Sequence, residues 1–73
     1  MQKEITTEVA GTIWTIDAKP GDAVSAGDSV VTVESMKMEI PVELEADSIV
    51  AEILVEAGQE VEEGQVVAKV TTG

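Results

Sequence analysis

The sequence predicts an all-β fold, in the form of a two-layer antiparallel sandwich with approximate two-fold symmetry. Three observations lead to this prediction. Valine and isoleucine are prominent in a chain whose hydrophobic fraction is 44%. Apolar residues alternate with polar ones at the period of a half-buried strand, and the two halves of the chain repeat each other. Because 73 residues provide at most one small core, we expect a single domain over residues 1–73.

The strands are assigned in chain order from local composition. A β-branched run over residues 30–35 predicts one strand, and the alternation of apolar and polar side chains over residues 38–45 predicts its neighbour. Residues 49–55 and 66–70 predict two more strands. The segment 52–63 is rich in glutamate, but two glycines divide it into pieces too short for a helix. We therefore expect a turn, a short strand around Val61 and a second turn.

An internal repeat fixes how these strands are organised. A shift of 37 residues aligns identical residues in the two halves, namely Ile16 with Ile53, Gly21 with Gly58, Val24 with Val61, Gly27 with Gly64, Val30 with Val67, and Val33 with Val70. Each half thus has the pattern strand, glycine turn, short strand, glycine turn, strand. The glycines suit turns that need a positive φ. Two such halves are expected to bury each other's apolar faces in a sandwich.

A hairpin connects the two halves at the centre of the chain. Residues 30–35 and 38–45 form its arms, which puts Met36 and Lys37 at its tip. Lys37 has 36 residues before it and 36 after it. The repeat therefore predicts one particular lysine at an exposed turn, and by symmetry we expect it on the pseudo-two-fold axis.

Charge and composition exclude several classes of function. The net charge of −11 comes from 15 acidic residues against 4 lysines, so neither nucleic acid nor an anionic membrane surface is expected as a partner. The chain has no Cys and no His, which removes the usual thiolate, imidazole and zinc chemistry. We expect no catalytic residue and no metal site. The N-terminal segment lacks the pattern of a signal peptide and no run is long enough to span a membrane, so a cytoplasmic location is expected.

The segment Glu34-Ser35-Met36-Lys37-Met38-Glu39-Ile40-Pro41 resembles the attachment motif of biotinyl domains. The resemblance covers essentially the whole chain, including the turns at residues 20–24 and 27–28 and their repeats. It is greatest to the short, free-standing members of the biotinyl/lipoyl attachment family. It implies a flattened β-sandwich, also called a barrel-sandwich hybrid, of two four-stranded antiparallel sheets with the attachment lysine at a hairpin tip. The family usually has Ala at the place of Ser35, and Gly at the place of Ser48, which matches Gly11 in the repeat.

The same resemblance implies a carrier function. A biotin protein ligase would acylate Lys37, and the loaded chain would then carry a carboxyl group between biotin carboxylase and carboxyltransferase components. The flanking residues would be recognised by the ligase or the partner enzyme; these are Glu34, Ser35, Met36, Met38 and Glu39. The methionines have an alternative role as packing residues at the end of the sandwich, and the glutamates as a solvated face. The other lysines are expected to be ordinary surface residues, with Lys3 in a frayed terminus.

Two alternatives to a biotin carrier follow from the same residues. The first is a lipoyl carrier for an acyl-transfer or glycine-cleavage complex, loaded with lipoate by a lipoyl ligase. Lipoyl domains share the fold and the lysine, but they usually have Asp before it and Ala after it, so methionine on both sides favours biotin. The second alternative is an unmodified interaction module.

Overall fold

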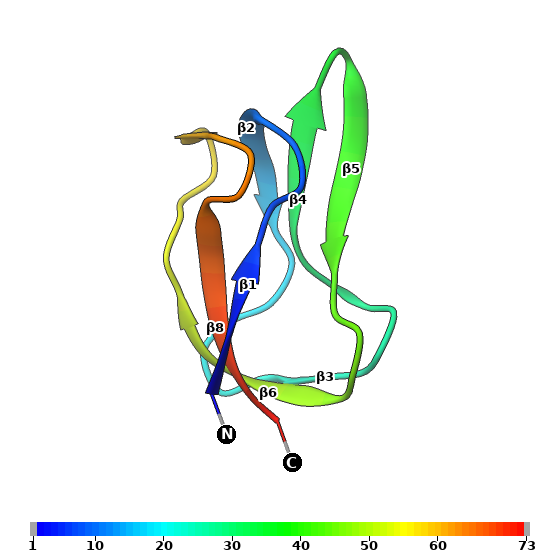
Figure 1. Cartoon of the computed structure of the whole chain (residues 1–73), viewed down its shortest axis with the longest axis vertical. Helices are drawn as coiled ribbons and strands as arrows, with labels where there is room; N and C mark the ends of the chain where they lie inside the picture. The colour runs from blue at the N-terminus through cyan, green and yellow to red at the C-terminus, as the bar shows by residue number, and fades with distance from the viewer. Residues whose placement is uncertain (1, 73) are drawn as a thin grey trace.

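The computed structural model describes residues 2–72, and all the regular structure in this range is β (Figure 1). The strands are β1 (Gln2–Thr6), β2 (Gly11–Ile16), β3 (Ala23–Val24), β4 (Ser29–Ser35), β5 (Met38–Glu43), β6 (Ser48–Ile53), β7 (Glu60–Val61) and β8 (Val66–Thr72). They form two four-stranded antiparallel sheets, in the orders β1-β8-β6-β3 and β5-β4-β2-β7. The predicted sandwich of two four-stranded sheets is confirmed. The single domain predicted over residues 1–73 includes Met1 and Gly73, which lie outside the described residues.

The 37-residue repeat of the sequence is a repeat of the structure. It relates β2 to β6, β3 to β7 and β4 to β8 with identical bounds, and it relates β1 to β5 with a one-residue difference at the start. Turn contacts repeat as well, because the Gly21 amide donates to the Val50 carbonyl at 2.7 Å and the Gly58 amide donates to the Ile13 carbonyl at 2.7 Å. Each sheet takes strands from both halves. Neither half therefore completes a sheet alone, and we expect the domain to fold as one cooperative unit.

The glycine turns have the conformation that the sequence predicts. Gly21 and its repeat Gly58 have φ of 94° and 90°, and Gly27 and its repeat Gly64 have φ of 89° and 85°. L-amino acids with a Cβ adopt such values only with strain. The four positions thus need glycine for backbone reasons, which explains why they recur at the repeat distance.

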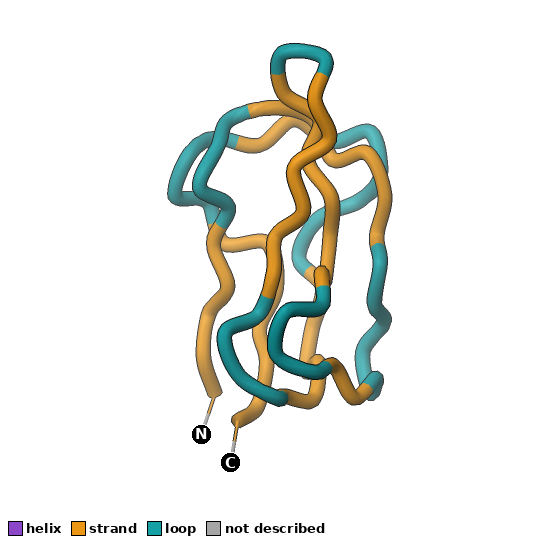
Figure 2. Tube along the Cα trace, turned by 90° about the vertical axis from the view of Figure 1, so that its right-hand side faces the viewer, coloured by secondary structure: helices purple, strands orange, loops and turns teal. Residues whose placement is uncertain are grey.

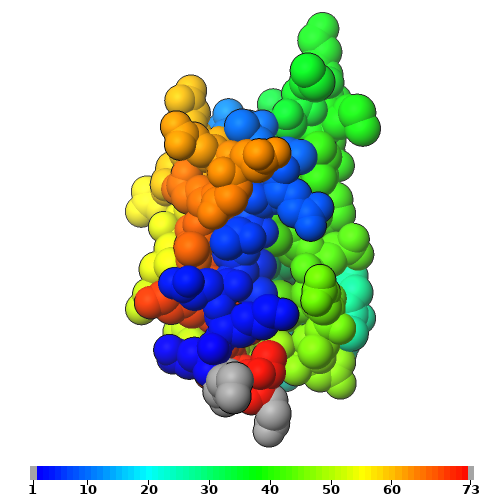
Figure 3. All heavy atoms as spheres, in the orientation of Figure 1, coloured from blue at the N-terminus to red at the C-terminus, as the bar shows by residue number. Residues whose placement is uncertain are grey.

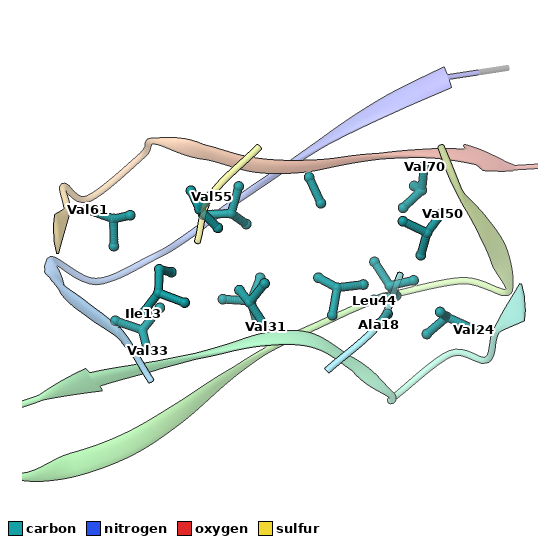
Figure 4. Close-up of a cluster of buried hydrophobic side chains, with 14 residues drawn as sticks. Ile13, Ala18, Val24, Val31, Val33, Leu44, Val50, Val55, Val61 and Val70 are labelled. Carbon is teal, nitrogen blue, oxygen red and sulfur yellow. The ribbon is translucent and has the colours of Figure 1, made fainter. Parts of the chain in front are cut away.

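The core lies between the two sheets and consists mainly of valine (Figure 4). Its members include the repeat pairs Val30 with Val67, Val31 with Ala68, and Val33 with Val70, all of which are fully buried. Two consecutive residues of β4 can both be buried because the register with β5 shifts between Ser29 and Val31, as in a β-bulge. Burial of each such valine stabilises the fold by roughly 1.5–3 kcal/mol relative to exposure.

Four expectations from the sequence need correction. Lys3 does not lie in a frayed terminus but in β1, where it pairs with Val70 of β8 and its ammonium lies 3.8 Å from Glu45. The strand expected over 49–55 spans residues 48–53, and the one expected over 38–45 ends at residue 43. Lys37 is not on the pseudo-two-fold axis, because that axis exchanges the β4–β5 hairpin with the β8–β1 pair. The tip and the start of β1 consequently lie at opposite ends of the molecule (Figures 1 and 2).

Candidate functional site

The tip of the β4–β5 hairpin is a two-residue loop. Ser35 and Met38 form the last pair of the two strands, so only Met36 and Lys37 lie between them. These are the two non-glycine residues with positive φ in residues 2–72, at 53° for Met36 and 64° for Lys37. A two-residue loop with positive φ at both positions is the pattern of a type I′ turn, which normally selects Asn-Gly. A left-handed conformation costs about 1–2 kcal/mol for an ordinary residue, so this turn holds residues that its backbone does not favour.

The side chains at the tip point away from the sandwich. Met36 is 93% exposed and Met38 is 62% exposed, and Lys37 is exposed between them. Within residues 2–72 the Lys37 ammonium makes no hydrogen bond and no ion pair. Figure 3 shows the tip, in green, standing clear of the rest of the surface. Both methionine side chains are therefore largely exposed, and the amine is presented to solvent at the end of a narrow projection.

A pair of glutamates stands directly below the tip. Glu34 and Glu39 are cross-strand partners in the register of β4 and β5, and both are exposed. Like charges that face each other across a ladder are destabilising, and neither carboxylate has an ion-pair partner among the described residues. Ser35, half-buried, lies between this pair and the turn. The structure thus brings together all six residues that the sequence singled out, within the last two pairs of one hairpin and its loop.

The base of the projection is fixed by close packing of β2 against β4. Thr12 pairs with Glu34. A Cβ placed on the neighbouring Gly11 would lie 2.3 Å from the Glu34 carbonyl oxygen and 2.9 Å from the Val33 Cγ1 atom. Gly11 is therefore needed for close approach of two backbones. The sequence marked this glycine only through the family resemblance, since neither a turn nor a positive φ identifies it.

The other polar cluster lies away from the tip, around the carboxylate of Asp17 just beyond β2. Hydroxyl groups donate to it from Thr15 at 2.8 Å, Ser29 at 2.5 Å and Thr32 at 2.7 Å. Partial burial acts to raise the pKa of Asp17, but the hydrogen bonds from Ser29, Thr32 and Thr15 outweigh it, and the pKa lies below its usual value of 3.8. The cluster ties the end of β2 to β4. No group of three or more acidic side chains in residues 2–72 is arranged to hold a metal ion.

No helix long and apolar enough to cross a membrane occurs in the described part of the chain.

The fold and the tip can be compared with known proteins. Residues 1–70 match the domain family described as "Biotin-requiring enzyme". The biotin/lipoyl attachment protein of Bacillus subtilis is 36% identical over 67 residues, which are 92% of each chain. The alpha3 subunit of a biotin-dependent acyl-coenzyme A carboxylase from Mycobacterium leprae is 38% identical over 90% of this chain, which spans 11% of that subunit.

Among solved structures, a similar one is the lipoyl domain of the 2-oxoglutarate dehydrogenase complex from Azotobacter vinelandii. It is 37% identical, with a TM-score of 0.74, and the match covers 89% of this chain and 82% of that domain. Relatives of this chain thus include a biotin-dependent protein and a lipoyl domain. Domains of this family carry biotin or lipoate on a lysine. The chain belongs to the family of biotin/lipoyl attachment domains.

Proposed function

We propose that the chain is a carrier that is biotinylated on Lys37 and moves a carboxyl group between the active sites of a biotin-dependent carboxylase or transcarboxylase. The observation that carries the proposal is an exposed, unpaired amine on a strained two-residue turn between two exposed methionines. The chain's part is presentation, and none of its residues acts as a catalyst. Its partners are a biotin protein ligase, a biotin carboxylase and a carboxyltransferase, in the cytoplasm.

The Lys37 amine fits the chemistry of attachment. In the loading step its Nζ forms an amide bond to the carboxyl carbon of biotinyl adenylate, the bond from that carbon to AMP breaks, and the amine gives up its proton. The ligase supplies the adenylate from ATP and removes the proton. The narrow hairpin lets an enzyme surround Nζ, and its ladder limits the ordering that binding requires. Biotin then supplies a ureido nitrogen on which a carboxyl group is carried, and the tether raises the local concentration of that group at the partner.

The neighbours of Lys37 serve recognition in this proposal. Met36 and Met38 offer exposed, adaptable apolar contacts on both sides of the amine. Glu34 and Glu39 offer two unpaired carboxylates to basic groups of a ligase or carboxylase. Ser35 orients the turn from within the ladder. Exposed apolar groups, opposed like charges and left-handed residues each reduce stability, and their concentration at one tip supports a functional constraint there.

Lipoate is the second candidate for the attached group, and the chain would then serve an acyl-transfer or glycine-cleavage complex. The specific observation in its favour is the 37% identity to a lipoyl domain over 89% of this chain. Methionine on both sides of Lys37 favours biotin instead. A purely unmodified interaction module is the remaining alternative.

Intact-mass measurement with matched variants tests the proposal. The wild-type chain incubated with biotin protein ligase, biotin and ATP is expected to gain one biotin. Lys37→Ala is expected to gain none, and Lys19→Ala, which removes another exposed lysine, is expected to be labelled like wild type. Unlabelled wild type, or a labelled Lys37→Ala chain, would contradict the assignment.

A double substitution, Met36→Ala with Met38→Ala, tests the role of the methionines. Both side chains are exposed, so the melting temperature is expected to change little while the rate of biotinylation falls. A folded double variant that is labelled at the wild-type rate would show that the methionines are not recognised.

A further inference from the structure

A groove of about 380 Å³ runs beside the hairpin, between the β1–β2 connection and β5. It is lined by Thr6, Thr7, Glu8, Val9, Gly27, Ile40, Pro41, Val42, Glu43, Leu44 and Glu45. Figure 3 views the side on which the blue surface of the first strand and its connection meets the green surface of β5. The volume lies within the range of roughly 300–1,000 Å³ that small-molecule sites occupy. The groove lies outside the attachment motif except at Ile40 and Pro41.

The lining has an apolar floor and an acidic rim. Val42 and Leu44 are buried, and Val9 and Ile40 are half-buried beside them. The three glutamates of the lining, Glu8, Glu43 and Glu45, are exposed. The groove therefore offers apolar contact below and hydrogen-bond acceptors above, and it disfavours an anion.

The wall formed by the β1–β2 connection is held in place. The Thr7 amide donates to the Gln65 carbonyl at 3.0 Å, and the Gly64 amide donates to the Thr7 carbonyl at 2.8 Å. The buried Thr7 hydroxyl donates to the Val9 carbonyl at 2.9 Å and accepts from the Val9 amide at 3.2 Å. A wall with these contacts needs little further ordering when a group binds against it.

The groove lies within reach of a group attached to Lys37. Roughly eleven bonds separate the Lys37 Cα from the ring system of an attached biotin, which corresponds to a reach on the order of 14 Å. A strand rises about 3.3 Å per residue, so Ile40 lies about 10 Å and Val42 about 17 Å along β5 from Lys37. The end of the tether can thus reach the stretch of β5 that lines the groove.

We propose that this groove is an intramolecular docking site for the uncharged head group carried on Lys37. The proposal rests on the proposed function and deepens it. The bicyclic ring of biotin has a hydrocarbon and thioether face that suits Val9 and Ile40, and two ureido N–H groups that suit the carboxylates of Glu8 and Glu43. A dithiolane ring has no N–H donor, so the rim fits biotin better than lipoate. The glutamates repel an anionic head group, so the groove retains the uncharged form and releases a carboxylated one.

NMR of the biotinylated chain tests the docking directly. We expect nuclear Overhauser effects between ring protons and the methyl groups of Val9 and Ile40. We also expect amide shift changes over residues 6–9 and 40–43, in addition to residues 35–39, when the biotinylated and unmodified chains are compared. Changes confined to residues 35–39, with no ring contacts to the groove, would overturn the docking site and leave biotinylation intact. A chain that gains no biotin mass at Lys37 would overturn both proposals.

A pair of variants separates the groove from general charge effects. Val9→Glu puts a carboxylate in the floor, whereas Ala46→Glu adds the same charge at the repeat-related, exposed position outside the groove. In the biotinylated chains we expect the shift changes at residues 40–43 to fall several-fold in Val9→Glu and to persist in Ala46→Glu. Equal shift changes in both variants would overturn the proposal. If Val9→Glu does not fold, the proposal is decided by the nuclear Overhauser effects between the biotin ring and the groove in the wild-type chain.

Discussion

Replacement of Gly11 by alanine tests the packing that supports the hairpin. The added Cβ would lie 2.3 Å from the Glu34 carbonyl oxygen, 2.9 Å from the Val33 Cγ1 atom and 3.1 Å from the Glu34 carbonyl carbon. Two of these atoms belong to the backbone of β4, which is held by ladders to β2 and β5 and cannot rotate away. The overlap can be relieved only if β2 and β4 move apart at Glu34, which lies three residues before Lys37 in the sequence.

The expected loss in the free energy of unfolding is about 3 kcal/mol, at the upper end of the range for overpacking into a rigid site. In a domain of this size each kcal/mol lowers the melting temperature by roughly 4–8 °C, so a fall of about 12–24 °C is expected. Urea unfolding followed by far-ultraviolet circular dichroism gives the free energy directly.

The repeat provides the matched control. Ser48 occupies the position that corresponds to Gly11, already carries a Cβ, and donates from its hydroxyl to the Ala46 carbonyl at 3.0 Å. Ser48→Ala removes only this hydrogen bond, worth about 1 kcal/mol. Gly11→Ala should therefore be clearly the less stable of the two variants. A Gly11→Ala chain as stable as Ser48→Ala would refute the steric reasoning.

Three further outcomes follow from the backbone and from Asp17. Met36→Gly puts a glycine at φ 53°, so the free energy of unfolding should stay unchanged or rise by up to about 1 kcal/mol while biotinylation slows. A fall in both the free energy of unfolding and the rate of biotinylation would show that Met36 is structural. Alanine at either repeat-related glycine, Gly21 or Gly58, should lower the free energy of unfolding by roughly 1–3 kcal/mol and by similar amounts, since φ is 94° and 90°. Strongly unequal melting temperatures of the two variants would contradict the symmetry. The pKa of Asp17 is lowered in the folded state, so its contribution to stability is present above pH 3.8 and is lost as the pH falls through the lower, folded value. In urea unfolding at pH 7, Asp17→Asn should thus be less stable than wild type, and at pH 3 the difference in the free energy of unfolding should be smaller. An equal difference at the two pH values would refute this reasoning.

The sequence predicted the fold well where the repeat carries information. Identical valines and glycines at a distance of 37 residues identify the strands and turns that the two halves share. The strand β1 was not predicted from the sequence, because Gln2–Thr6 contains only one large apolar residue. Its conformation is imposed by pairing with β8 from the other end of the chain, which local pattern does not reveal.

The sequence predicted which residues lie together at the hairpin tip but not the geometry of the tip, and their role in attachment stays a prediction. The place of Lys37 at the hairpin tip follows from the lengths of the two arms. The assumption that the centre of the sequence lies on the symmetry axis is wrong, because the axis exchanges the hairpin with the β8–β1 pair. The left-handed pair Met36-Lys37 could not be predicted either, since turns of this kind normally select Asn-Gly.

The central claim is that Lys37 carries biotin, and a competition experiment tests it most directly. The chain is incubated with biotin protein ligase and lipoyl ligase together, with biotin, lipoate and ATP, and its intact mass and the mass of the peptide containing Lys37 are measured. The predicted result is one biotin per chain, located on Lys37. A lipoyl adduct in preference to biotin, a modification on another lysine, or an unchanged mass would contradict the claim.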